Sequence, residues 1–215
     1  MPFDLTQTDH LLTTTRAVRK RLDLTRPVPI ELISDCVRIG CQAPAGGNVQ
    51  TWRWLIVEDP VLKARLAELY RRAYQPYMAA QREAVERLGR SDAGAIMESS
   101  DYLAQVLADV PALVIPCMLG RPDASMQGSL AGWYGSILPA VWNFMLAARS
   151  RGLGTAWTTL HLAYEAEARE LLGIPDTVSQ VALIPVAYHT GDDFKPGSRL
   201  PVEKVTYRNA WKQPI

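Results

Sequence analysis

Apolar residues recur at helical spacing in several separate stretches of this 215-residue chain. The first complete stripe comprises Ile30, Ile33, Val37 and Cys41. It predicts a helix, because residues three or four positions apart share one face, and this helix should end before the loop-like composition of residues 43–48. A shorter helix is predicted at about residues 164–172, because Gly173 and Pro175 form a stop signal directly after it. Gly152 likewise predicts a left-handed cap after a preceding helix.

Short apolar runs predict three buried strands, at residues 54–57, 112–115 and 178–188. The second of them is expected to end at Pro116. Between the first two strands, residues 60–109 have a looser helical pattern, which Pro76 is expected to break or kink. Residues 81–100 mix charges with glycine and alanine, so we expect this part to be the most exposed and mobile. Strands and helices that do not alternate regularly favour an α+β layered fold over a doubly wound one.

Residues 128–148 form the least polar stretch, and no charged side chain stands between Asp123 and Arg149. The stretch is long enough for a transmembrane helix. Its scattered polar residues, its proline and the lack of a second such span favour instead a helix buried on all sides or in a subunit interface. The first ten residues lack the basic region and apolar run of a signal peptide, so we expect a cytoplasmic protein that does not enter a membrane.

Charge and cysteine content exclude several functions. The chain has 23 Lys and Arg against 22 Asp and Glu, too small a basic excess for a nucleic-acid partner. Cys36, Cys41 and Cys117 are too few and too unevenly spaced for a zinc site or a disulfide framework. The chain has no His-x-x-x-His or Cys-x-x-Cys pair, so no metal is expected. It also lacks the glycine motifs that accompany a serine nucleophile or a Rossmann site, so neither of these is expected. His161 could contact a ligand, although a lone histidine is more often structural.

Four clusters of loop residues remain as candidates for chemistry. Segment 15–21 holds four cations, and residues 194–201 carry two more that suit a phosphate. Residues 44–52 combine two glycines, which allow a ligand to approach the backbone closely, with polar amides. Residues 152–160 join an aromatic ring to hydroxyls and a flexible backbone, a combination that suits a flat heteroaromatic ligand. Taken singly, each cluster is also compatible with an ordinary helix end, turn or solvated loop.

In this order, the four clusters resemble the FMN-dependent nitroreductase family. That family has an Arg-Arg-Ser-x-Arg segment, an Ala-Pro-Ser-Gly-Gly-Asn-x-Gln-Pro-Trp loop, a Gly-Leu-Gly-Thr loop and a late Arg-x-Pro. In this chain they stand as Thr15-Arg16-Ala17-Val18-Arg19, residues 43–52, residues 152–155 and Arg199-Leu200-Pro201. The resemblance, which covers residues from about 13 to 211, implies one α+β domain over residues 1–215. It would be a three-layer sandwich with a central mixed β-sheet flanked by helices, in an intertwined homodimer, with a helical excursion at about residues 61–109 in the substrate pocket.

The resemblance also implies two FMN sites at the dimer interface, each built from both chains. Arg16 and Arg19 would face the phosphate, the ribityl chain and the pyrimidine edge of the ring. Arg199 would hold the phosphate, with Lys195 in place of a lysine that some members carry nearer to it. The partner would supply the loop at 44–48, and the uncharged helix would form the core of the dimer. The implied cofactor-binding residues are Arg16, Ala17, Arg19, Pro44, Ala45, Gly46, Asn48, Gln50, Trp157, Thr158, Thr159, Lys195 and Arg199.

Some residues depart from the family pattern. Ala17 replaces a serine whose hydroxyl usually bonds the cofactor, and Thr15 replaces the first arginine. Ala45 replaces the loop serine, and Thr51 replaces a proline. One lost hydrogen bond to a charged group costs about 1.5–3 kcal/mol. We therefore expect FMN to bind, but with reduced affinity.

The implied activity is a ping-pong oxidation and reduction. NADH or NADPH would pass a hydride to N5 of FMN, and a flat, electron-poor acceptor such as a nitroaromatic or a quinone would then be reduced. The flavin performs the chemistry, so no catalytic acid or base is expected, while Arg16 or Arg19 would stabilise the anionic reduced flavin. The candidate pocket residues are Trp52, Tyr70, Tyr74 and Tyr77, although the tyrosines also suit a helix packing face.

Three alternatives stay open. The same scaffold could perform another reduction, such as a dehalogenation or an ene-type reduction. It could also bind or store FMN without turnover, which the alanines at positions 17 and 45 keep open. A membrane-attached interaction protein is the third alternative. The sequence does not choose between NADH and NADPH.

Overall fold

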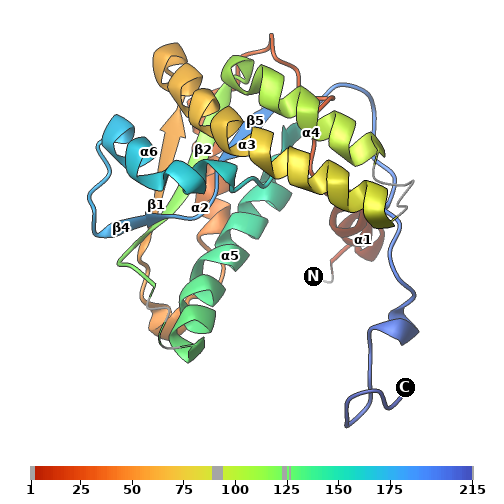
Figure 1. The fold of residues 1–215 in the computed structure, drawn as a ribbon. Helices are drawn as coiled ribbons and strands as arrows, with labels where there is room; N and C mark the ends of the chain where they lie inside the picture. The colour runs from red at the N-terminus through yellow and green to blue at the C-terminus, as the bar shows by residue number, and fades with distance from the viewer. Residues whose placement is uncertain (1–2, 89–93, 123–124, 126, 215) are drawn as a thin grey trace. The chain divides into compact units, whose positions relative to one another are not determined.

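The computed structural model describes residues 3–88, 94–122, 125 and 127–214. The chain divides into two compact units, residues 16–191 and the pair of segments 1–15 and 192–215. The larger unit contains the sheet and most of the helices (Figure 1). Each unit is described separately below.

The described residues of the larger unit form a five-stranded sheet. Its strands are β1 (Trp52–Val57), β2 (Ala112–Leu119), β3 (Leu153–Thr155), β4 (Val178–Gln180) and β5 (Ile184–Tyr188). Their order is β1-β2-β5-β3, and β4 pairs with β2. Pairing between these strands is antiparallel, and an isolated parallel bridge joins Ala17 to Thr155. The sheet is therefore mixed, as predicted.

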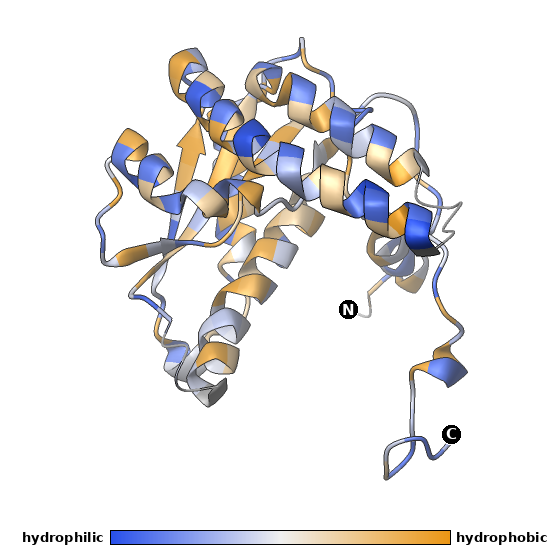
Figure 2. Cartoon of the chain, in the orientation of Figure 1, coloured by the Kyte–Doolittle hydropathy of each residue, from blue (hydrophilic) through white to orange (hydrophobic). Residues whose placement is uncertain are grey.

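Strand β2 is buried on both faces, because side chains alternate across a strand. Ala112, Val114 and Met118 belong to a core cluster that includes residues of α2 (Ile30–Gly40) and α5 (Gln127–Arg149). Leu113 and Ile115 point to the opposite face and are equally buried. That face is covered by the remaining helices of the unit, namely α3 (Pro60–Leu88), α4 (Gly94–Val106) and α6 (Glu165–Leu172), so the fold is an α+β three-layer sandwich. Figure 2 shows the strands as mostly hydrophobic and α3 as mixed, as expected for a helix with one outward face.

Helix α5 is apolar nearly all round but is buried on one side only. Phe144 and Ile137 are inaccessible to solvent, whereas Tyr134, Leu138 and Trp142 are 39%, 37% and 39% exposed. Helix α2 packs closely on the buried side: a Cβ on Gly40 would lie 2.8 Å from the carbonyl oxygen of Ala140. Among the described residues, no helix has the length and hydropathy to span a membrane.

Several predicted elements are confirmed. Helix α2 begins at Ile30 as expected, and α6 ends at Gly173, whose φ of 63° is left-handed. Gly152 also has a left-handed φ of 76°. In the exposed stretch at 81–100, residues 81–87 and 94–100 are mostly solvent-accessible, and residues 89–93 lie outside the described part of the chain.

The structure corrects two predictions about proline. Helix α3 continues through Pro76, so this proline does not end the helix, because its missing N–H removes a single backbone hydrogen bond. Strand β2 continues through Pro116. This proline falls between residues 112–114, which pair with β5, and residues 117–119, which pair with β4. Its missing N–H therefore interrupts no ladder on that side.

Other elements differ from the sequence expectations. Residues 178–188 form two strands separated by residues 181–183, and not one long strand. Strand β3 lies within residues 152–160, for which the sequence predicts a loop. Three short 3₁₀ turns of the larger unit, η1 (Gly46–Asn48), η3 (Leu107–Asp109) and η4 (Leu160–Tyr164), connect longer elements.

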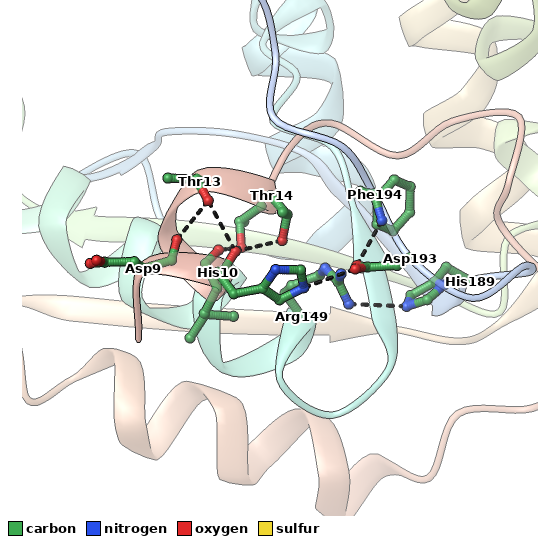
Figure 3. A network of polar contacts seen from close by, with 10 residues as sticks. Asp9, His10, Thr13, Thr14, Arg149, His189, Asp193 and Phe194 are labelled. Atoms are coloured by element: carbon green, nitrogen blue, oxygen red, sulfur yellow. Dashed lines mark hydrogen bonds and ion pairs between the residues drawn. The ribbon is translucent and has the colours of Figure 1, made fainter. Parts of the chain in front are cut away.

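The smaller unit contains helix α1 (Leu5–Thr14) and the 3₁₀ turn η5 (Val202–Lys204). His10 and Asp193 form an ion pair at 2.9 Å, and the Asp193 carboxylate also accepts a hydrogen bond from the backbone N–H of Phe194 (Figure 3). The hydroxyls of Thr13 and Thr14 donate to carbonyls one turn earlier. Figure 3 also draws a pair from the larger unit, in which Arg149 Nη1 lies 3.3 Å from His189 Nε2.

Candidate functional site

A cavity of about 200 Å³ lies between α3, α4 and the segment that follows β3. Its lining residues are Arg19, Tyr70, Tyr74, Tyr77, Ser100, Trp157, Thr158, Thr159 and Leu160. All but Ser100 and Leu160 are among the residues that the sequence assigned to the cofactor or the substrate. The fold thus brings together four segments that are far apart in the sequence, namely Arg19, the tyrosines of α3, Ser100 of α4 and residues 157–160.

Close packing against β3 positions Arg19. The backbone N–H of Val18 donates to the carbonyl of Thr155 at 2.8 Å, beside the parallel bridge of Ala17. A Cβ on Gly154 would lie 2.9 Å from Cγ1 of Val18, so this approach requires glycine. The contact places Arg19 in the same cavity as residues 157–159.

Residues 157–159 contribute different groups. The hydroxyl of buried Thr158 donates to the carbonyl of Leu183, and the Leu183 N–H donates back to the carbonyl of Thr158 at 2.8 Å. Thr158 therefore anchors the segment to the sheet. Trp157 is half-buried and Thr159 is exposed, so their side chains are accessible from the cavity.

Tyrosines of α3 form another wall. The rings of Tyr70 and Tyr74 stack with centroids 6.0 Å apart, and both residues are buried. The Tyr74 hydroxyl donates to the Asp101 carboxylate at 2.7 Å, and Arg82 pairs with the same carboxylate. Burial and the nearby Asp101 raise the pKa of Tyr74 well above its usual range. Tyr77 is 48% exposed, so the tyrosines are at once a packing face and a cavity wall.

Helix α4 is tied to the cation segment. Arg19 Nη1 donates to Ser99 Oγ at 3.5 Å, and Lys20 pairs with Glu98 at 2.5 Å. Ser100 follows directly and lines the cavity. Leu160 belongs to the predicted cluster 152–160, whereas Ser100 has no local sequence signal, because it reaches the cavity only through the packing of α4.

The predicted loop 44–50 lies elsewhere in the same unit. Gly46 N–H donates to Ser136 Oγ at 3.0 Å, near the first half of α5, and Asn48 has a left-handed φ of 55°. Gln50 donates to the Asn48 side chain at 3.4 Å. Neither these residues nor Pro44 and Ala45 line the cavity of their own chain. Their role in a partner's site stays a prediction.

Of the remaining predicted residues, Trp52, Arg16 and Ala17 belong to the same unit but do not line this cavity. Trp52 is buried in the cluster of α2 and α5, where its indole N–H donates to the Ser136 carbonyl at 2.6 Å. Arg16 and Ala17 are exposed beside β3. Lys195 and Arg199 belong to the smaller unit, where Arg199 donates to its neighbour's carbonyl at 2.8 Å.

His161 lies in η4 and is fully buried, without lining the cavity. In the described part of the chain, neither of its ring nitrogens has a hydrogen-bond partner. Burial lowers its pKa to about 4, although Gln180 and the Glu165 carboxylate act in the opposite direction. His161 is therefore neutral at physiological pH, in agreement with a structural role.

The family model described as the Nitroreductase family matches residues 12–188 of this chain. The chain belongs to the nitroreductase family. Membership supports FMN as the cofactor and places the protein among flavoprotein oxidoreductases. It confirms the resemblance drawn from the four clusters.

Similar proteins have several names. A putative NADH dehydrogenase/NAD(P)H nitroreductase from Methanothermobacter thermautotrophicus is 27% identical over 198 residues, which are 89% of this chain and 84% of that protein. An iodotyrosine deiodinase from Nematostella vectensis is 25% identical over 88% of this chain and 70% of that protein. The crystal structure of a putative NADH dehydrogenase/NAD(P)H nitroreductase from Parabacteroides distasonis is 25% identical, with a TM-score of 0.67, and covers 95% of this chain and 99% of that one.

The cavity has groups that fit a flavin. A guanidinium, an accessible threonine and a half-buried indole share it. Such a set offers donors to ring carbonyls and an aromatic surface to a flat ring system. The residues present are therefore compatible with FMN.

Proposed function

We propose that this protein is an FMN-dependent oxidoreductase that takes a hydride from NADH or NADPH and reduces a nitroaromatic, a quinone or a similar flat, electron-poor acceptor in a ping-pong reaction. The observation that carries the proposal is the shared cavity of Arg19, residues 157–159 and the tyrosines of α3. Bound FMN would supply the hydride transfer in both half-reactions. A cytoplasmic location is part of the proposal.

The residues of this chain would bind the ring and control its surroundings. Arg19 would place positive charge where negative charge develops on reduction. Trp157 would lie along the ring, and Thr158 would hold that segment in place through its bonds to Leu183. The buried rings of Tyr70 and Tyr74 would keep water from the acceptor.

We also propose a homodimer, in which loop 44–50 reaches the partner's cofactor. Two observations support it. The exposed face of α5, formed by Tyr134, Leu138 and Trp142, is an apolar surface of the kind that is buried in subunit interfaces. Loop 44–50 is bonded to the same helix through Ser136, next to this face. Arg16, Lys195 and Arg199 are proposed to contact the FMN phosphate and ribityl chain.

A reductive dehalogenation is the second candidate. The deiodinase name of a relative that matches 88% of this chain favours it. Both candidates need FMN and differ in the acceptor. 3-Iodotyrosine and duroquinone, a single-ring quinone, are therefore suitable probes for separating them.

Steady-state kinetics test the proposal. Initial rates of NADPH or NADH oxidation are measured anaerobically at several fixed concentrations of duroquinone, of 4-nitrobenzoate or of 3-iodotyrosine. We expect parallel double-reciprocal lines with the quinone or the nitro compound. Turnover of 3-iodotyrosine alone would favour the dehalogenase, and a bound flavin that neither nucleotide reduces would indicate an FMN-binding or storage protein.

A further inference from the structure

Tyr70 stands out among the cavity residues because it is a buried residue whose hydroxyl has no hydrogen-bond partner among the described residues. The residue is 4% exposed and lines the cavity. Within the described ranges, its hydroxyl has no hydrogen-bond partner, whereas the neighbouring Tyr74 hydroxyl donates to Asp101 at 2.7 Å. A donor without a protein partner, on a buried side chain that lines a cavity, indicates a ligand that accepts its hydrogen bond.

Burial keeps the Tyr70 hydroxyl protonated, so that it can donate a hydrogen bond. Burial raises the pKa of Tyr70 to about 12, and the guanidinium of Arg19 only partly opposes this effect. The hydroxyl therefore keeps its proton over the whole physiological pH range. Arg19, which lines the same cavity, adds a second donor that carries positive charge.

We infer that the Tyr70 hydroxyl donates a hydrogen bond to a quinone or nitro oxygen of the acceptor, and that the acceptor is a small, single-ring compound. This inference rests on the proposed function and names the residue that recognises the oxidised substrate.

The size of the cavity supports the single ring. Its volume of about 200 Å³ lies below the ~300–1,000 Å³ that is usual for drug-sized ligands. Any part of it that the cofactor fills leaves less space for the acceptor. The stacked rings of Tyr70 and Tyr74 limit the cavity on the α3 side.

The hydrogen bond would act on the charge that forms during reduction. A quinone takes a hydride, which is two electrons and one proton, from reduced FMN, and then takes a second proton from water to give the hydroquinone. Before the second proton arrives, one oxygen carries a negative charge. Tyr70 would stabilise this oxygen without giving up its own proton.

The test compares reoxidation of pre-reduced protein in three forms, namely the wild type, Tyr70→Phe and the control Tyr102→Phe. Tyr102 is a half-buried residue of α4 that does not line the cavity. FMN-loaded protein is reduced with dithionite and mixed anaerobically with duroquinone or with ferricenium, a one-electron acceptor without oxygen. Reduction by dithionite makes the test independent of NADH and NADPH, so a failure of the proposed nucleotide reaction is seen separately.

We expect Tyr70→Phe to retain FMN and to react with duroquinone about tenfold to a hundredfold more slowly, because a hydrogen bond to a charged group is lost. Its reaction with ferricenium and both reactions of Tyr102→Phe should match the wild type. Equal duroquinone rates in all three proteins would overturn the inference. An equal loss with both acceptors would also overturn it, because it would indicate a structural role.

A second measurement applies if Tyr70→Phe is not recovered as folded protein. A crystal of the wild-type holoenzyme is soaked with 4-nitrobenzoate, and the position of the nitro group is determined. A nitro oxygen within hydrogen-bond distance of the Tyr70 hydroxyl would support the inference. A nitro group bound anywhere else would overturn it.

Discussion

Replacing His161 by leucine should remove a pH-dependent loss of stability. His161 is fully buried, and burial lowers its pKa from 6.5 to about 4. Between these two values the unfolded chain binds a proton that the folded protein does not, so stability falls as the pH falls from about 6.5 towards 4. At about 1.4 kcal/mol for each pH unit, the loss through this residue approaches about 3 kcal/mol.

The variant His161→Leu should have a similar free energy of unfolding at pH 7.5, because the neutral imidazole has no hydrogen-bond partner among the described residues. Between pH 6.5 and 4.5 the variant should lose less stability than the wild type. Some dependence remains, because burial and the nearby Arg149 also lower the pKa of His189.

The effect is measured by urea unfolding at a series of pH values, with tryptophan fluorescence as the readout. The protein and FMN concentrations are kept constant, because bound ligands and subunits change apparent stability. The control is His10→Gln, which changes an exposed histidine that pairs with Asp193. Equal pH slopes in the wild type and His161→Leu would refute the reasoning. A histidine titration by NMR that assigned His161 an ordinary pKa would refute it as well.

Gly154→Ala places a Cβ 2.9 Å from Val18 and should destabilise the protein by about 1–3 kcal/mol in calorimetry, whereas Gly94→Ala meets nothing within 4 Å and should not. Equal melting temperatures would contradict the close contact at β3. Lys63→Met removes a buried ammonium that donates to two backbone carbonyls and should lower the free energy of unfolding by about 1–3 kcal/mol; an unchanged urea midpoint would count against it. Trp142→Arg on the exposed face of α5 should convert the proposed dimer to a monomer in light scattering, and a monomeric wild type would contradict the dimer.

Long periodic elements could be predicted from the sequence, whereas elements fixed by their neighbours could not. Helix α2 has a full apolar stripe, and α6 has a glycine stop signal, so both were located correctly. Strand β3 has three residues, too few for any periodicity, and it exists because β5 pairs with it. The continuation of β2 past Pro116 depends on the change of partner from β5 to β4, which is a property of the assembled sheet.

The candidate site shows the same division. The chemistry of Arg19 and of residues 157–159 was apparent from composition and from the family pattern, and the structure places these residues in one cavity. Trp52 was expected beside the tyrosines, but an indole N–H needs an acceptor when buried, and here Ser136 provides one within the core. Ser100 lines the cavity because α4 packs beside α3, which no local sequence signal shows.

The visible absorption spectrum of the purified protein tests the central claim most directly, followed by anaerobic addition of NADPH, then NADH, then duroquinone. We predict flavin bands that bleach with at least one nucleotide and return with the quinone. Flavin bands that neither nucleotide bleaches would contradict the reductase and leave a flavin-binding protein. A colourless protein that does not take up added FMN would contradict the account as a whole.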